Sequence, residues 1–337
     1  MLSSTGTGDD RNGSITANEF TDFTAFDALR ATLDLNGVAG MPLTTDLVYI
    51  KLDENNAGTP DDVNLMGFNL GTKFDAADSE LEAYFLNKRD RQGTVANVDK
   101  NGSISTMGMR GSAKPVEGSN VYGELAYQFG REGNRLDGDT GVGGIQSATT
   151  HHAWAFDLGA DYTLANVATT PMLGAEWIFY SGMDKNGAFA GWDPIASSYF
   201  PTMIRAFQTR AGVTGLYPVD AGGVPGGFTN SHQLALYGSL KPIEDLTIAP
   251  RLTWFVADKG ILAPGGAVGG VDGKRKSFIG TEWDTKVTYN YTDDVQFGLA
   301  YALFAPGNVF RKTSGVHAGV GGQDPAQELI STVSVKF

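Results

Sequence analysis

The sequence contains no cysteine and no long hydrophobic run, and each absence removes a class of protein. Because none of the 337 residues is Cys, thiol catalysis and c-type haem attachment are excluded, whereas an exported protein without disulfides is compatible. No apolar stretch approaches the ~20 residues of a membrane-spanning helix. Membrane barrels escape this hydropathy test, because half of the residues in each of their strands are polar.

Basic residues are also scarce. The chain has 25 Lys and Arg against 38 Asp and Glu, a formal net charge of -13. No basic stripe is available to neutralise phosphates, so nucleic acid is not an expected partner. The adjacent His151 and His152 stand at a predicted loop-to-strand boundary without an acid–base constellation around them. We interpret both as surface histidines and expect no enzyme.

The N-terminus lacks a secretion signal. Residues 2–20 have neither the charged start nor the apolar core of such a segment. An outer-membrane protein requires this signal, so the sequence predicts either that the chain is not exported or that it has been cut upstream.

What the sequence does contain is a period of two, clearest between residues 278 and 337, where every second side chain is apolar, aromatic or Thr. Such two-faced strands occur in soluble sandwiches and in membrane barrels. The runs here are nearer the 9 to 11 residues of a barrel strand than the usual ~5 to 6. Tyr289 and Tyr291 stand at a strand end, where an interfacial aromatic girdle would lie. We therefore predict an all-β, antiparallel transmembrane β-barrel of the outer-membrane type, with a soluble extracellular β-protein as the weaker alternative.

The same alternation marks thirteen candidate strands along the chain. They are residues 25–36, 41–53, 63–75, 79–89, 103–112, 119–131, 152–164, 171–182, 231–241, 246–257, 278–291, 294–305 and 327–337. The connections alternate between short turns and long loops, the longest being residues 183–230. Bacterial barrels show this rhythm because their periplasmic turns are short and their extracellular loops long.

The odd strand count predicts that part of the barrel is missing. If the last strand descends to the periplasm, residues 1–24 form an extracellular segment and residues 25–337 the barrel. Single-chain bacterial barrels have an even number of strands. We therefore expect the thirteen or fourteen visible strands to be the C-terminal portion of a barrel of about 16–18 strands. A missed strand within residues 183–230 would restore evenness, but would break the alternation of long and short connections.

Several fragments, in this order, resemble the alginate-export family of outer-membrane porins. They are Phe26 to Arg30, Met107 to Gly111, Gly123 to Gly130, Ala153 to Ala155, Gly159 to Tyr162, Pro171 to Gly174, Ser181-Gly182, Gly280 to Asp284 and Phe304 to Gly307. The resemblance covers most of the chain from about residue 25. It implies a passive channel in the outer membrane of Gram-negative bacteria, through which an anionic polyuronate leaves the cell past basic residues at a constriction. The expected partners are outer-membrane lipid, a polar or polyuronate solute and, through the terminal Phe337, the barrel-insertion machinery.

The resemblance assigns pore-lining roles that strand phase also supports. It implies Arg30, Arg110 and Arg251 as lumen cations, with Glu124, Glu282 and Asp284 as acidic counterparts, and alternation places all six on the inner face. Alternation adds Asp157, Asp161, Glu176 and Lys286 to the same face. Because a net acidic wall should repel a polyuronate, a general cation-tolerant porin is the alternative. The same charges are equally explained as ordinary ion pairs of a wet lumen.

Two further features have open interpretations. The loop 183–230 is long enough to fold inward as a plug or constriction, and would present Arg205 and Arg210. Near the N-terminus, Asp10, Asn12, Ser14 and Glu19 have the spacing of an EF-hand calcium loop. Position 1 of that loop is Gly8, and D-x-N-G is also ordinary turn chemistry. Calcium is the one cofactor considered.

Overall fold

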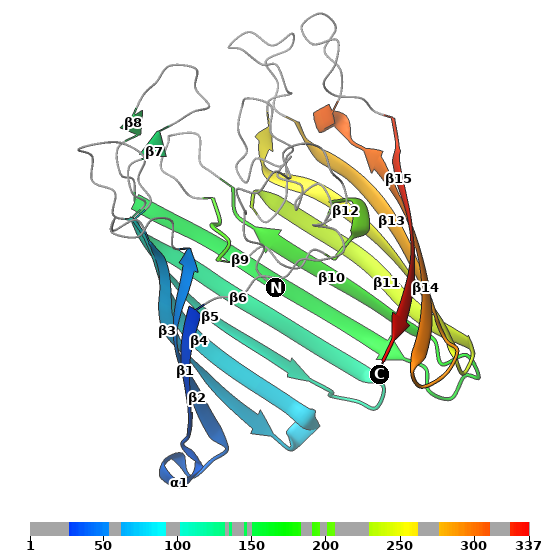
Figure 1. The fold of residues 1–337 in the computed structure, drawn as a ribbon, viewed down its shortest axis with the longest axis horizontal. Helices are drawn as coiled ribbons and strands as arrows, with labels where there is room; N and C mark the ends of the chain where they lie inside the picture. Colours follow the sequence, from blue (N-terminus) through cyan, green and yellow to red (C-terminus); the bar gives the residue numbers. More distant parts are fainter. Residues whose placement is uncertain are drawn as a thin grey trace, which may run out of the picture.

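The computed structural model of the protein describes residues 27–53, 62–91, 102–131, 135–136, 145–146, 150–182, 191–195, 201–205, 229–261, 276–310 and 324–336. Thirteen strands form one antiparallel sheet, in which each strand pairs with the next one along the chain (Figure 1). They are β1 (Asp27–Asp34), β2 (Leu43–Asp53), β3 (Val63–Phe74), β4 (Ser79–Asp90), β5 (Gly102–Ala113), β6 (Ser119–Arg131), β9 (Thr150–Thr163), β10 (Met172–Tyr180), β11 (Ser231–Ile243), β12 (Leu246–Ile261), β13 (Lys276–Asn290), β14 (Val295–Pro306) and β15 (Ala326–Val335).

The remaining elements are short. A two-stranded ladder joins β7 (Arg135–Leu136) to β8 (Ile145–Gln146), and α1 (Asn36–Ala39), η2 (Ala76–Asp78) and η3 (Asn308–Phe310) are single turns. None of the helices in the described ranges is long and apolar enough to cross a membrane.

The predicted strands are confirmed: each exists, and its ends lie within two residues of the prediction except at the C-terminal end of β12. β10 pairs directly with β11, so no strand is inserted between them in the described sheet. Most of residues 183–230 lie outside the described part of the chain, and a missed strand there stays an open alternative. The ladder β7–β8 falls within a predicted connection, and α1 begins at the last residue of the predicted strand 25–36; neither element is predicted from the sequence. Whether the barrel is larger stays a prediction.

The sheet curves into a trough with β1 and β15 at its two edges (Figure 1). Its outward face is apolar and exposed: Leu29, Leu173 and Leu329 keep 73%, 69% and 67% of their surface accessible, and Trp177 and Trp283 are also exposed. A monomer in water rarely shows so continuous an apolar surface. Lipid would cover this face in a membrane barrel.

Short turns close the strands at one end of the sheet. In the turn after β1, the side-chain oxygen of Asn36 accepts the Leu43 backbone N–H at 2.7 Å, and Gly40 takes a left-handed φ of 69° at the end of α1. In the turn after β3, Asp78 accepts a hydrogen bond from the Lys114 ammonium at 2.6 Å, which lowers the pKa of the Asp78 carboxyl. These contacts stabilise adjacent turns outside the spanning part of the sheet.

The one core cluster among the described residues lies on the trough's inner face. Phe255 of β12, Ile279 of β13 and Phe304 of β14 are buried beneath Ile204 and Val309. Ile204 belongs to residues 201–205, so part of the predicted loop 183–230 packs inward against the sheet. This packing identifies the inner face and places a fixed segment inside the trough.

Candidate functional site: the charged inner wall

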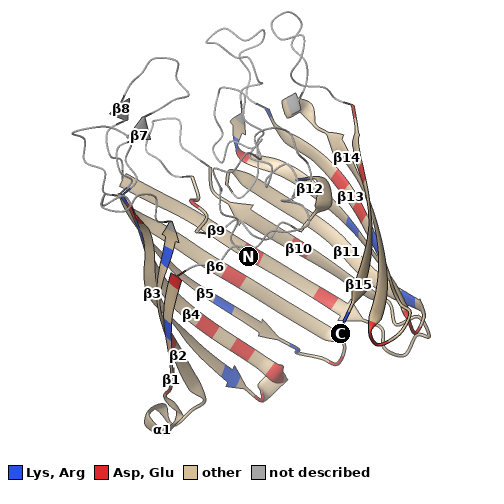
Figure 2. Cartoon of the chain, viewed as in Figure 1, with Lys and Arg blue, Asp and Glu red and all other residues tan. Residues whose placement is uncertain are grey.

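The register of the sheet places the predicted charged residues on one face. Arg110 lies opposite Glu124, Glu124 opposite Asp157, and Arg251 opposite Asp284. Residues directly opposite in a ladder point to the same side. Following the ladders strand by strand gives the inner wall, which we define as Arg30, Asp46, Glu82, Arg110, Glu124, Asp157, Asp161, Glu176, Arg251, Glu282, Asp284 and Lys286. Figure 2 shows that acidic and basic positions are distributed over the strands of the sheet. Their effect on permeation stays a prediction.

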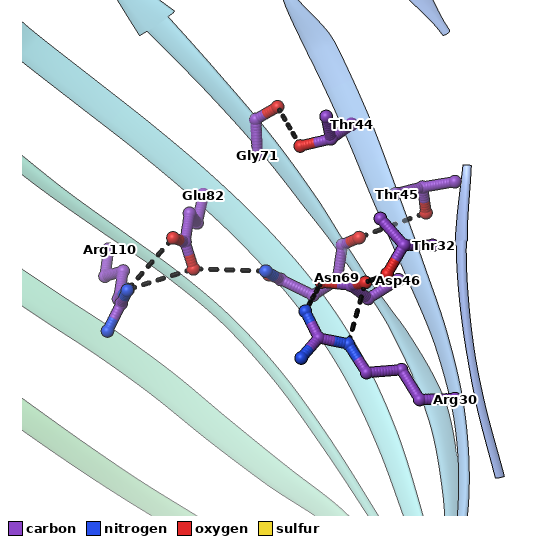
Figure 3. A network of polar contacts seen from close by, with 9 residues as sticks. All are labelled: Arg30, Thr32, Thr44, Thr45, Asp46, Asn69, Gly71, Glu82 and Arg110. Atoms are coloured by element: carbon purple, nitrogen blue, oxygen red, sulfur yellow. Dashed lines mark hydrogen bonds and ion pairs between the residues drawn. The ribbon is translucent and has the colours of Figure 1, made fainter. Parts of the chain in front are cut away.

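Arg30 is bound to Asp46, a carboxylate that was not among the residues predicted from the sequence. Its guanidinium donates to both oxygens of Asp46 on β2, at 2.9 and 2.7 Å, and the Thr32 hydroxyl donates to Asp46 at 2.5 Å (Figure 3). A bidentate pair of this kind fixes the orientation of both groups. Asp46 could have been found by the same alternation, since it falls in phase on the neighbouring strand.

Arg110 on β5 has the same arrangement as Arg30. It donates to both oxygens of Glu82 on β4, at 3.0 and 2.9 Å, and the Asn69 amide donates to Glu82 at 3.1 Å (Figure 3). Arg110 therefore pairs with Glu82 on one side of its strand rather than with Glu124 on the other.

Three tyrosines lie across glycines and reach inner-wall carboxylates. The ring of Tyr84 covers Gly108, and its hydroxyl donates a hydrogen bond to Glu124. In the same way, Tyr122 covers Gly159 and donates to Glu176. Tyr237 covers Gly174 and donates to Asp161. In each, a Cβ built on the glycine would come within 2.4 Å of the ring or nearer. The glycine therefore makes room for the ring to lie against the wall. These triplets cannot be recognised in the sequence, because the tyrosine, the glycine and the carboxylate of each come from different strands.

Arg251 is the most buried of the three predicted lumen cations. It forms an ion pair with Glu176 of β10, and its guanidinium lies 5.6 Å from the centre of the Tyr237 ring. Glu176 also accepts the Tyr122 hydroxyl at 3.0 Å. Asp161 accepts the Asn120 amide at 3.0 Å, and the ion pairs of the described residues include no basic partner for it.

Glu282 and Asp284 hold the inward-folded segment rather than lining open lumen. The backbone N–H of Ile204 donates to Glu282 at 2.6 Å, that of Arg205 donates to Glu282 at 3.1 Å, and that of Met203 donates to Asp284 at 3.0 Å. Both carboxylates are buried. They satisfy the first N–H groups of the helical turn 203–205, which have no partners within the turn.

Arg205 itself is fully buried, with its guanidinium 5.6 Å from the ring centre of Phe255 and 5.9 Å from that of Phe304. Burial lowers the pKa of this guanidinium to about 10, and the nearby Glu282 opposes the shift. The group is still cationic at neutral pH. Its placement corrects the expectation that the loop presents Arg205 to solute.

A second part of the loop is held to the opposite side of the trough. The Lys88 ammonium binds the Asp193 carboxylate at 2.8 Å, and Gln128 bonds to both the backbone N–H and C=O of Asp193 at 2.9 and 2.7 Å. His151 shares a hydrogen bond of 3.1 Å with Gln128 and is completely buried. The surface interpretation is therefore wrong for His151, while His152 is exposed as expected.

Several predicted residues lie outside the described part of the chain. The proposed calcium residues Asp10, Asn12, Ser14 and Glu19 do so, as do Arg210 and Phe337. Calcium binding and recognition by the insertion machinery stay predictions.

Comparison with known proteins gives a family. The sequence profile described as "Alginate export" matches residues 54–321 of this chain. A search of curated proteins finds no match. Among solved structures, the NanC porin has 9% sequence identity and a TM-score of 0.34, with 93% of this chain and 100% of that chain covered.

Two larger outer-membrane structures are also similar. A mutant of the ferric enterobactin receptor PfeA from Pseudomonas aeruginosa has 14% identity and a TM-score of 0.41, covering 85% of this chain and 42% of its own. The copper transporter OprC has 11% identity and a TM-score of 0.37, covering 91% and 57%. This chain spans less than half the length of the ferric enterobactin receptor.

Proposed function

Because the chain belongs to the alginate export family and lies in the bacterial outer membrane, we propose that it forms a channel for passive diffusion of polar solutes, whose inner wall favours cations over polyanions. The family and the fold are those of transport porins. The proposed preference for cations rests on the charges of the inner wall.

The observation that carries the proposal is the pairing of the arginines. Arg30, Arg110 and Arg251 are each bound to a wall carboxylate, namely Asp46, Glu82 and Glu176. Three further inner-wall carboxylates, those of Glu124, Asp157 and Asp161, have no basic side chain within ion-pair distance in the described ranges. The paired part of the wall is neutral, and the remainder, in which Lys286 is the one basic residue, is net acidic.

A polyanion would have to compete with those carboxylates for each arginine. Displacing Glu82 from Arg110 leaves an uncompensated carboxylate beside the solute, so the exchange brings like charges together. A cation meets no such cost at Glu124, Asp157 or Asp161. Rings of acidic groups select cations in other pores for the same reason.

Polyuronate transport is the second candidate, and exposure of two arginines favours it. The Arg30 and Arg110 side chains keep 66% and 52% of their surface accessible. Exposed ion pairs contribute little to stability, so a polymer carrying many carboxylates could exchange with them. The family description also names alginate export.

The test is the reversal potential of the protein in planar bilayers under a salt gradient, followed by addition of a polyuronate. We expect cation selectivity and no block by the polymer. Glu124→Gln should move the reversal potential toward zero, because it removes an unpaired inner-wall charge. Asp293→Asn removes the same charge from the exposed turn between β13 and β14 and should leave the potential unchanged.

Anion selectivity with block by polyuronate would overturn the cation preference and support the second candidate. Equal shifts in Glu124→Gln and Asp293→Asn would show that total charge, rather than the inner wall, sets the selectivity.

A further inference from the structure

A cavity of about 820 Å³ lies between the inner wall and residues 192–195 of the inward-folded loop. Its described lining comes from strands between β1 and β10 and from Trp192, Pro194 and Ile195. The volume is within the range of about 300–1,000 Å³ typical of small-molecule sites. The cavity therefore has room for a solute larger than a hydrated ion.

The charges around this cavity are unbalanced. Two arginines line it, Arg30 and Arg110, and both are held by carboxylates that also line it. Beyond those pairs, Glu124 and Asp157 face the same space. The cavity carries an acidic excess that its own arginines do not neutralise.

Glu124 and Asp157 also stand directly opposite each other on paired strands. Like charges in this position destabilise a sheet unless something compensates them. Glu124 accepts one hydrogen bond, from the Tyr84 hydroxyl at 2.5 Å. The Oδ1 atom of Asp157 is buried and has no hydrogen-bond partner among the described residues. A cation in the cavity would offset the repulsion between the two carboxylates without having to reach this buried atom.

The cavity also has aromatic walls. Trp192 and Tyr180 both line it, with ring centres 6.4 Å apart and planes inclined by 35°. Tyr84 lines it beside Glu124. Aromatic faces attract cations through their quadrupole, and they also cover the apolar part of a ligand.

Trp192 is fixed in place before any ligand arrives. Its backbone N–H donates to the Ser181 carbonyl at 3.0 Å, and the next residue, Asp193, is held by Lys88 and Gln128. A ligand stacked on this ring would not have to order the segment that carries it. Binding sites of this kind lose less affinity to conformational entropy.

We propose that this cavity binds a small organic cation, a protonated or quaternary amine, with its ammonium group between Glu124 and Asp157 and its apolar part against Trp192 and Tyr180. The inference deepens the proposed function and rests on it, since the channel supplies the route by which such a solute reaches the cavity.

The experiment is isothermal titration calorimetry of the full chain, folded in detergent micelles, with choline chloride at fixed ionic strength. The matched ligand is the uncharged alcohol in which carbon replaces the ammonium nitrogen of choline. We expect saturable binding of choline and binding of the alcohol weaker by about tenfold or more. Equal affinities, or no saturable binding of choline, would overturn the proposal.

Two variants locate the site. Asp157→Asn should weaken choline binding about tenfold. Asp161→Asn is the matched control, because it removes the same charge from the same strand and face but lies outside the described lining of the cavity. Circular dichroism checks that both fold, and the choline–alcohol comparison on the unaltered chain does not depend on either variant. Equal weakening by the two variants would overturn the assigned location.

This outcome is separable from that of the proposed function. A cation-selective reversal potential without choline binding would leave the channel proposal standing and remove the cavity site. An anion-selective potential with choline binding would do the reverse.

Discussion

Glu82 on β4 and Glu282 on β13 are both inward carboxylates of the same trough, yet they have different partners. Glu82 binds a guanidinium and remains partly accessible to the lumen, whereas Glu282 is completely buried and binds two backbone N–H groups of the inward-folded loop. The first is part of a charged wall, and the second is an anchor. Alternation along a strand therefore tells which way a carboxylate points, and the segment that packs on it determines its role.

The largest effect is expected from removing the anchor. Glu282→Ala leaves the N–H groups of Ile204 and Arg205 without their acceptor in a buried site, which should lower the free energy of unfolding by about 3 kcal/mol. Loss of the anchor should also widen the lumen. Urea unfolding in lipid vesicles measures the first effect and single-channel conductance the second. Unchanged conductance would show that residues 201–205 do not restrict the pore.

Glu82→Ala is the matched variant at the other region. It removes the partner of a half-exposed Arg110, so it should have a smaller effect on stability than Glu282→Ala and shift the reversal potential toward anions. If Glu82→Ala and Glu282→Ala lower the free energy of unfolding equally, the distinction between wall and anchor is wrong.

The next largest effect on stability is expected at the glycines that are covered by tyrosine rings. In Gly159→Ala, the new methyl carbon would meet the Tyr122 ring at 2.2 Å, so the ring must move away from Glu176. We expect a loss of about 2 kcal/mol in the free energy of unfolding. Gly71→Ala is the control, since its nearest atoms would be 3.6 Å away. A similar loss in both variants would mean that strand glycines matter here for some reason other than the ring.

The smallest effect on stability is expected at the rim of the wall. Arg30 is exposed, so Arg30→Ala should leave the unfolding transition unchanged within error. Because it frees Asp46, the reversal potential should become more cation-selective. A shift toward anions would contradict the neutral pairing of Arg30 with Asp46. The unfolding transition and the reversal potential are measured on the same protein preparation.

Much of the wall could be predicted from alternation alone. Arg30, Arg110 and Arg251 face inward because successive side chains of a strand point to opposite sides, which is a property of the local backbone. The same local rule located the thirteen strands, and the exposed apolar outward face follows from it. The outer-membrane location and the family agree with the fragments from Phe26 onward that indicated them.

The partners of those residues depend on the tertiary structure. Arg110 pairs with Glu82 rather than Glu124, and Tyr122 reaches Glu176 across Gly159, because register brings together residues far apart in the chain. His151 is buried, and Glu282 is an anchor, because of where parts of the loop 183–230 pack. The side of the sheet to which a side chain points depends on neighbouring residues of the same strand and could be predicted from the sequence. Pairing and burial depend on long-range contacts, so only the folded chain decides which inward charges neutralise one another, and thus which solutes the wall would favour.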